Sequence, residues 1–177
     1  MRSYSRLFPT VFKKAQGAIL EDREGIKYID FLSGVGTLNY GHNNPQIKES
    51  LLSYIQSDGI VHGLDLATVA KEEFLKAFET IIFKPRQLNY KIQFPGPTGT
   101  NAVEAALKLA RNITRRETVI AFSNGYHGVT LGSLATTAKA SQRASAGIGT
   151  SGVTFMPYDG YLGGDIDTTE YLDKVLS

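Results

Sequence analysis

One pattern, repeated from about residue 90 onward, limits the folds open to this chain: a short apolar run, a turn rich in glycine, and a run with helical spacing. The apolar runs are YKIQF at 90–94, TVIAF at 118–122 and GVTFMPY at 152–158. Strands that alternate with helices are joined by crossover connections, which make neighbouring strands parallel. The pattern therefore predicts an α/β fold in which helices flank a mostly parallel sheet.

The residues before this repeat follow another pattern. Strand-like runs lie on either side of the turn EDREG, and Gly25 can adopt the positive φ angle that a tight turn needs, which predicts a hairpin. Asn44 followed by Pro45 is typical of a helix start, and apolar residues then recur every four positions until Gly59. A second apolar stripe, over about residues 66–82, predicts another helix.

We divide the chain into two parts on this basis. Residues 1–60 form an amino-terminal segment with the hairpin, a glycine-rich loop and a helix, and residues 61–177 form the first part of a larger domain. The last residues, YLDKVLS, stop inside a helical pattern without a cap, and a parallel sheet of so few strands would leave an edge uncovered. We therefore expect the natural chain to continue beyond Ser177.

The composition excludes several classes of function. A hydrophobic content of 42% is ordinary for a globular protein, and a net charge of +2 argues against a nucleic-acid surface. The absence of cysteine excludes disulfides, thiolate nucleophiles and cysteine-ligated zinc, and His42, His62 and His127 lack metal-ligand spacing, so no metal site is expected. No signal sequence or membrane-spanning run occurs, which predicts a cytoplasmic protein without a membrane partner.

The turn before the strongest helical run, at Gly99 and Thr100, is the main candidate site. A helix that begins directly after a strand and a glycine turn presents unsatisfied N–H groups at the carboxyl edge of a parallel sheet, where a phosphate group binds well. An i,i+4 ion pair between Glu104 and Lys108 is expected on the outer face of the same helix. The residues alone equally allow Gly99 to be a simple turn residue and Thr100 a helix cap.

Two nucleotide-binding alternatives fail on their motifs. A Walker sequence requires its last glycine to be followed by Lys and then Ser or Thr, and this combination does not occur in the chain. The stretch GVGTLNYG has the first two glycines of a dinucleotide fingerprint without the third, which disfavours a Rossmann-like dehydrogenase.

The loop FSNGYHG, residues 122–128, follows the next strand-like run, so we expect it at the same sheet edge as Gly99. Tyr126 could stack on a flat ring ligand, and His127 could donate a hydrogen bond to a phosphate or a substrate. Both residues could instead only shape the loop.

Three stretches in order, GIKYIDFLSGVGTLNYGHNNP, GPTGTNAVEAALKLAR and FSNGYHGVTLGSL, resemble the amino-terminal half of the class III pyridoxal-phosphate-dependent aminotransferases. The resemblance covers essentially the whole chain. It implies a fold-type I transferase, truncated here, with pyridoxal 5'-phosphate as cofactor and small amino and oxo acids as substrates. It also implies a homodimer in the full-length form, because the active sites of the family lie between subunits.

The resemblance also assigns roles to residues. Gly99 and Thr100 match the turn that holds the cofactor phosphate, Tyr126 matches the aromatic residue that stacks on the pyridine ring, and His127 lies beside it. A loop that contains Gly36, Thr37 and Asn39 matches the substrate side.

The lysine that forms the Schiff base with the cofactor, and the acid that holds the pyridine nitrogen protonated, are expected beyond Ser177. No catalytic residue is therefore expected in this chain, which should be inactive alone.

Within the family, the sequence of these motifs is most like that of the members that make 2,4-diaminobutyrate, for example for ectoine synthesis, from L-glutamate and aspartate 4-semialdehyde. Ornithine, acetylornithine or 4-aminobutyrate remain as alternative amino donors. A different hypothesis is a non-catalytic α/β module that binds a phosphate ligand or a partner protein.

Overall fold

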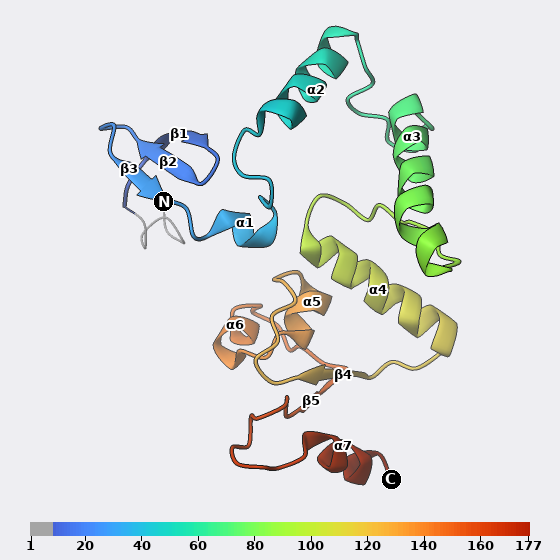
Figure 1. Cartoon of the computed structure of the whole chain (residues 1–177). Helices are drawn as coiled ribbons and strands as arrows, with labels where there is room; N and C mark the ends of the chain where they lie inside the picture. Colours follow the sequence, from blue (N-terminus) through green and yellow to red (C-terminus); the bar gives the residue numbers. More distant parts are fainter. Residues whose placement is uncertain (1–8) are drawn as a thin grey trace. The chain divides into compact units, whose positions relative to one another are not determined.

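The computed structural model describes residues 9–177, and the chain divides into two compact units after Leu88. In the first unit, strands β1 (Phe12–Gln16), β2 (Ile19–Asp22) and β3 (Lys27–Ile29) form an antiparallel sheet in that order (Figure 1). The predicted hairpin is confirmed as β2 and β3, which pair from Ile19 with Ile29 to Glu21 with Lys27. Strand β1 was not predicted, because FKKAQ has none of the alternation that marks a half-buried strand.

The turn between β2 and β3 is built on a buried carboxylate. Asp22 is 2% exposed, and its Oδ1 accepts hydrogen bonds from the N–H groups of Glu24 at 3.0 Å and Ile26 at 2.8 Å. The hydroxyl of Tyr28 donates to the other oxygen at 3.0 Å. Gly25 adopts φ 85°, the positive value that was predicted from its place in the turn.

The two predicted helices of the first unit are both present. Helix α2 (Pro45–Gln56) begins as predicted, with the Asn44 side chain accepting from the N–H groups of Gln46 and Ile47. Helix α3 (Val69–Phe78) begins after Thr68, whose hydroxyl accepts from the N–H of Lys71 at 3.2 Å, and it continues into a π-helical turn (Glu79–Phe83) and a 3-10 turn (Lys84–Arg86). A short segment, α1 (Ser33–Gly36), precedes α2.

The second unit contains the parallel strands. Its elements are α4 (Gly99–Thr114), β4 (Val119–Phe122), α5 (Leu131–Thr136), α6 (Ala140–Ala144), β5 (Val153–Met156) and α7 (Thr168–Leu176). β4 and β5 pair in parallel, from Val119 with Val153 to Phe122 with Met156, so the prediction of a parallel sheet is confirmed (Figure 1).

The prediction of a strand at residues 90–94 is wrong. These residues belong to no strand, and the sheet of this unit consists of β4 and β5. Side-chain alternation favours an extended backbone, but a strand also requires a neighbour in a hydrogen-bonded ladder. A composition pattern cannot supply that neighbour.

The buried core of the second unit lies around α5 and the two strands. Ala121, Leu134, Ala135 and Met156 are buried apolar side chains, and Ser133, Thr136 and Thr137 are buried beside them. Over residues 9–177, no buried side-chain nitrogen or oxygen lacks a hydrogen-bond partner.

Within the described part of the chain, every helix falls short of the length and apolar character needed to cross a bilayer.

We predict that Asp22→Ala lowers the free energy of unfolding of the protein by about 2 kcal/mol, because it leaves two turn N–H groups without their acceptor. Urea denaturation measures the change. Glu24→Ala, an exposed carboxylate in the same turn, is the control and should change it by less than about 0.5 kcal/mol. Equal effects of the two substitutions would show that the Asp22 bonds do not hold the turn.

Candidate functional site

The cap of α4 lies two residues earlier than the alternative interpretation, in which Thr100 is the cap, requires. Thr98 is the N-cap residue, and its N–H and hydroxyl lie 3.3 and 2.6 Å from Oδ1 of Asn101. Gly99 and Thr100 are therefore the first two residues of the helix, and Thr100 is not its cap.

The N–H groups of Gly99 and Thr100 are left as donors. Within residues 9–177 neither group donates to an acceptor, as expected for the start of a helix. The first turn contains no acidic residue, and a Cβ built at Gly99 meets no atom within 4 Å. The turn therefore offers two main-chain donors, the positive end of a 16-residue helix and open space beside them, a donor set that suits a phosphate group.

The loop between β4 and α5 lies against this turn. The hydroxyls of Thr100 and Thr130 are 2.7 Å apart, and Ser133 Oγ donates to the Thr100 carbonyl at 3.2 Å. Gly128 has φ 128°, and a Cβ at this position would lie 2.3 Å from Thr100 Oγ1. The structure thus brings Thr100 together with the segment that follows Tyr126 and His127.

Tyr126 and His127 are neighbours in sequence but line different hollows. The exposed Tyr126 lines a hollow of about 600 Å³ together with Lys139 and Arg143. His127 lines a largely apolar groove of about 480 Å³ that also involves Val103 of α4. The N–H of His127 donates to the buried Thr137 hydroxyl at 3.1 Å, which anchors the loop at this point.

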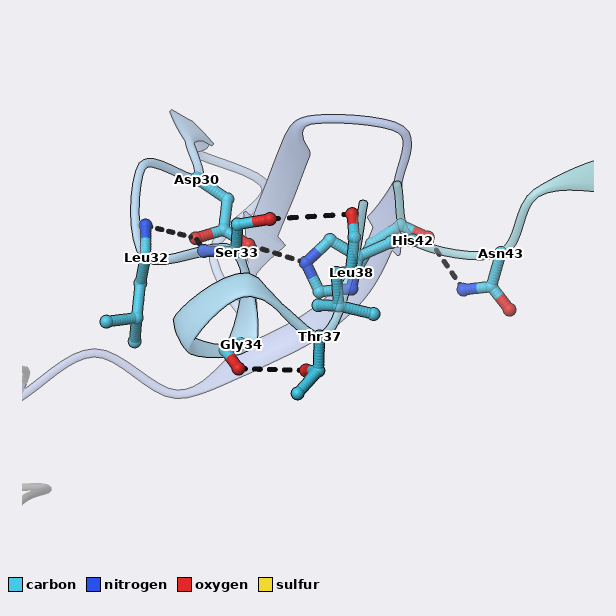
Figure 2. A network of polar contacts seen from close by, with 9 residues as sticks. Asp30, Leu32, Ser33, Gly34, Thr37, Leu38, His42 and Asn43 are labelled. Carbon is cyan, nitrogen blue, oxygen red and sulfur yellow. Dashed lines mark hydrogen bonds and ion pairs between the residues drawn. The ribbon is translucent and has the colours of Figure 1, made fainter. Parts of the chain in front are cut away.

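The residues predicted on the substrate side lie in the first unit, between β3 and α2, and Figure 2 shows Thr37 among them. Gly36 has φ 87°, and the Thr37 hydroxyl donates to the Gly34 carbonyl at 2.8 Å. Asn39 is exposed. These three residues belong to the first unit, whereas Gly99 and Thr100 belong to the second.

A part-buried contact between Asp30 and His42 holds this loop at both ends. His42 Nε2 lies 2.7 Å from Asp30 Oδ2, while Asp30 Oδ1 accepts from the N–H groups of Leu32 and Ser33 at 2.9 Å each (Figure 2). The Ser33 N–H bond and then the His42 contact lower the pKa of Asp30 below its ordinary value. Sequence reasoning treated His42 as structural and did not find its partner, which lies twelve residues away.

Glu104 is a second residue whose role was missed. The predicted ion pair with Lys108 is wrong, because the Glu104 carboxylate instead accepts hydrogen bonds from the Thr130 hydroxyl at 2.5 Å and the Ser133 N–H at 3.0 Å. The Thr130 bond is the main cause that lowers the pKa of Glu104. Gly128 and Gly132 were the available signals in the sequence, because the absence of a Cβ at these positions lets Thr100 and Glu104 approach closely.

The Asp30 pair predicts a pH dependence of stability. Because the pKa of Asp30 is lower in the folded than in the unfolded state, its ionised carboxylate stabilises the fold fully above the unfolded value near 3.8. That stabilisation is lost as pH falls through the lower folded value. Asp30→Asn should therefore lower the urea midpoint at pH 7, and the difference from wild type should shrink towards pH 3.

Asp65→Asn, which changes an exposed carboxylate of the same unit, is the control and should leave the midpoint unchanged at either pH. If the difference in urea midpoint between wild type and Asp30→Asn stays constant from pH 7 to pH 3, the ionised carboxylate of Asp30 is not what stabilises the fold.

Comparison with known proteins supports one family. A curated diaminobutyrate–2-oxoglutarate transaminase from Halomonas elongata is 58% identical over 99% of this chain and 42% of its own length. An uncharacterized aminotransferase from Sinorhizobium fredii is 59% identical over 100% of this chain and 40% of its own length. The chain thus spans about two fifths of the length of the curated relatives it matches.

A solved structure and a family model agree with these relatives. The crystal structure of taurine:2-oxoglutarate aminotransferase from Bifidobacterium kashiwanohense, in complex with PLP and glutamate, superposes with a TM-score of 0.75 at 25% identity, over 94% of this chain and 39% of that one. The model of the class III aminotransferases matches residues 1–171. The chain belongs to the class III aminotransferase family.

Proposed function

We propose that this chain is the amino-terminal part of a pyridoxal-phosphate-dependent aminotransferase that moves an amino group from L-glutamate to aspartate 4-semialdehyde. The products are L-2,4-diaminobutyrate and 2-oxoglutarate. The observation that carries this proposal is the 58% identity, over almost the whole chain, with the transaminase of that name from Halomonas elongata. In the proposal the complete protein is longer, forms a homodimer and works in the cytoplasm.

The first turn of α4 is the proposed site of the cofactor phosphate. The N–H groups of Gly99 and Thr100 supply two donors, and the helix dipole adds an attraction on the order of 1 kcal/mol for an anion. When bound, pyridoxal phosphate supplies the electron sink that allows a substrate to lose its α-proton.

Tyr126 supplies the ring that stacks on the cofactor in this proposal. His127, the next residue in the sequence, is the proposed donor to the phosphate or the substrate from the neighbouring groove. The exposed ring of Tyr126, on a loop that is anchored by the His127 N–H and Gly128, is suited to that role. On the substrate side, the loop with Gly36, Thr37 and Asn39 is held by the Asp30–His42 pair and offers exposed polar groups for an amino acid.

The chemical step needs residues outside this chain in the proposal. Lys108 is exposed on α4, and Lys139 is the N-cap residue of α6, in the hollow that Tyr126 lines. The family resemblance places the lysine that forms the Schiff base, and the acid that holds the pyridine nitrogen protonated, beyond Ser177. We therefore expect the 177-residue chain alone to have no transaminase activity.

The reaction is tested with the full-length protein, purified and loaded with pyridoxal phosphate. We expect 2-oxoglutarate to form from L-glutamate when aspartate 4-semialdehyde is the acceptor, and no turnover from residues 1–177 alone under the same conditions. Ornithine, acetylornithine, 4-aminobutyrate and taurine are offered as competing donors. A higher kcat/KM for any of these donors than for L-glutamate would overturn the proposed substrates. Turnover by residues 1–177 alone would overturn the proposal that the catalytic residues lie outside this chain.

The phosphate site is tested by Gly99→Ala in the full-length protein. The backbone accepts the change without strain and a Cβ meets no neighbour, so folding should be unaffected, but the methyl group occupies the space beside both donors. We expect pyridoxal phosphate to bind about tenfold more weakly, which fluorescence titration measures. Gly149→Ala, another unstrained glycine with open space, is the matched control, and equal affinity of the two variants would contradict the site.

A further inference from the structure

Helix α5 takes its side-chain cap from α4. Thr130 is the N-cap residue of α5, but its hydroxyl makes no cap bond to its own helix. The Glu104 carboxylate accepts instead from the N–H of Ser133, the third residue of α5, at 3.0 Å. That bond is the one a capping side chain ordinarily supplies, so Glu104 ties the start of α5 to α4.

The directions of the hydroxyl bonds follow from the number of protons. An ionised carboxylate has only lone pairs, and each threonine hydroxyl has one proton. Thr130 donates its proton to Glu104 at 2.5 Å, so the 2.7 Å contact between the two threonine hydroxyls runs from Thr100 to Thr130. The hydroxyl proton of Thr100 is therefore held inside this network, and its N–H is the donor that remains for a ligand.

Two glycines make this approach between α4 and the following segment possible. A Cβ at Gly132 would lie 2.3 Å from Glu104 Oε2, and a Cβ at Gly128 would lie 2.3 Å from Thr100 Oγ1. Gly132 has an ordinary backbone conformation, so contact with Glu104, and not strain, is what a side chain there would disturb.

We infer that Glu104 is a positioning residue of the phosphate site: through Thr130 and Ser133 it fixes the Thr100 hydroxyl and the Tyr126 loop relative to the donors of α4. The inference rests on the proposed function for the identity of the ligand. Glu104 itself does not touch the ligand. It sets the spacing between the donors at Gly99 and Thr100 and the aromatic ring.

The test is a double-mutant cycle in the full-length protein, with Glu104→Gln, Thr130→Val and the pair combined. Each single change should weaken pyridoxal phosphate about tenfold in fluorescence titration, the size of a typical coupling between contacting residues. The double variant should be no weaker than the weaker single one, because both changes break the same connection. Glu117→Gln, an exposed carboxylate of the same unit, is the control and should bind as wild type does.

A second readout separates positioning from stability. In Glu104→Gln, hydrogen exchange should become faster in residues 123–137 and stay unchanged in α2. If the melting temperature falls while the dissociation constant stays at the wild-type value, Glu104 serves stability alone and the inference is overturned. Single effects that multiply to about a hundredfold in the double variant overturn it as well, because Glu104 would then act without Thr130.

Gly132→Ala approaches the same connection from the other side and is available should Glu104→Gln fold poorly. The added methyl group displaces the carboxylate, so the affinity should again fall about tenfold. Unchanged affinity in Gly132→Ala overturns the inference.

Inorganic phosphate, followed by phosphorus NMR, separates this inference from the proposed function. Wild-type protein that binds phosphate but not pyridoxal phosphate would overturn the proposed function. The dissociation constants of the variants relative to wild type are then measured with inorganic phosphate as the ligand. Protein that binds neither would overturn both.

Discussion

The second unit depends on one close approach, between the first two turns of α4 and the segment from Gly128 to Ser133. Thr100 and Glu104 are four residues apart and so lie on one face of α4. They meet Gly128 and Gly132, which are also four residues apart, and a Cβ at either glycine would lie 2.3 Å from the facing side-chain oxygen. The missing side chains of the glycines let a threonine and a glutamate form hydrogen bonds where larger residues would hold the segments apart.

This approach continues into a small polar core. The Thr137 hydroxyl donates towards the carbonyls of Gly128 and Ser133, at 3.1 and 3.0 Å, and accepts from the His127 N–H. Thr137 and Ser133 are buried, and a buried hydroxyl is stabilising only when its partners are in place. The loop that carries Tyr126 is therefore fixed by directional bonds on its carboxyl side, which limits where an exposed ring on that loop can lie.

The features that the sequence predicted are those with local causes. The Asn44 cap, the positive φ of Gly25 and the alternation of β4, α5, β5 and α7 each follow from a few neighbouring residues, whereas α6 lies mostly in a stretch whose composition predicts a loop. The errors concern pairing across the chain. Strand β1 and the extended residues 90–94 differ in whether a partner strand is present, which composition does not encode. Glu104 fits the local rule for an ion pair with Lys108, but the donors of a distant helix start bind it instead.

The charges around the candidate phosphate site are arranged so that the helix start stays free of negative charge. A capping box ordinarily places Glu or Gln at the third helical position, and a glutamate there would repel an anion. Asn101 supplies the same acceptor to Thr98 without a charge. The nearest carboxylate on the helix, Glu104, is one turn further on and faces the donors of α5, which keep its pKa low and satisfy its oxygens. Its negative charge therefore stabilises the supporting structure, while the uncharged first turn leaves its two N–H groups for a ligand.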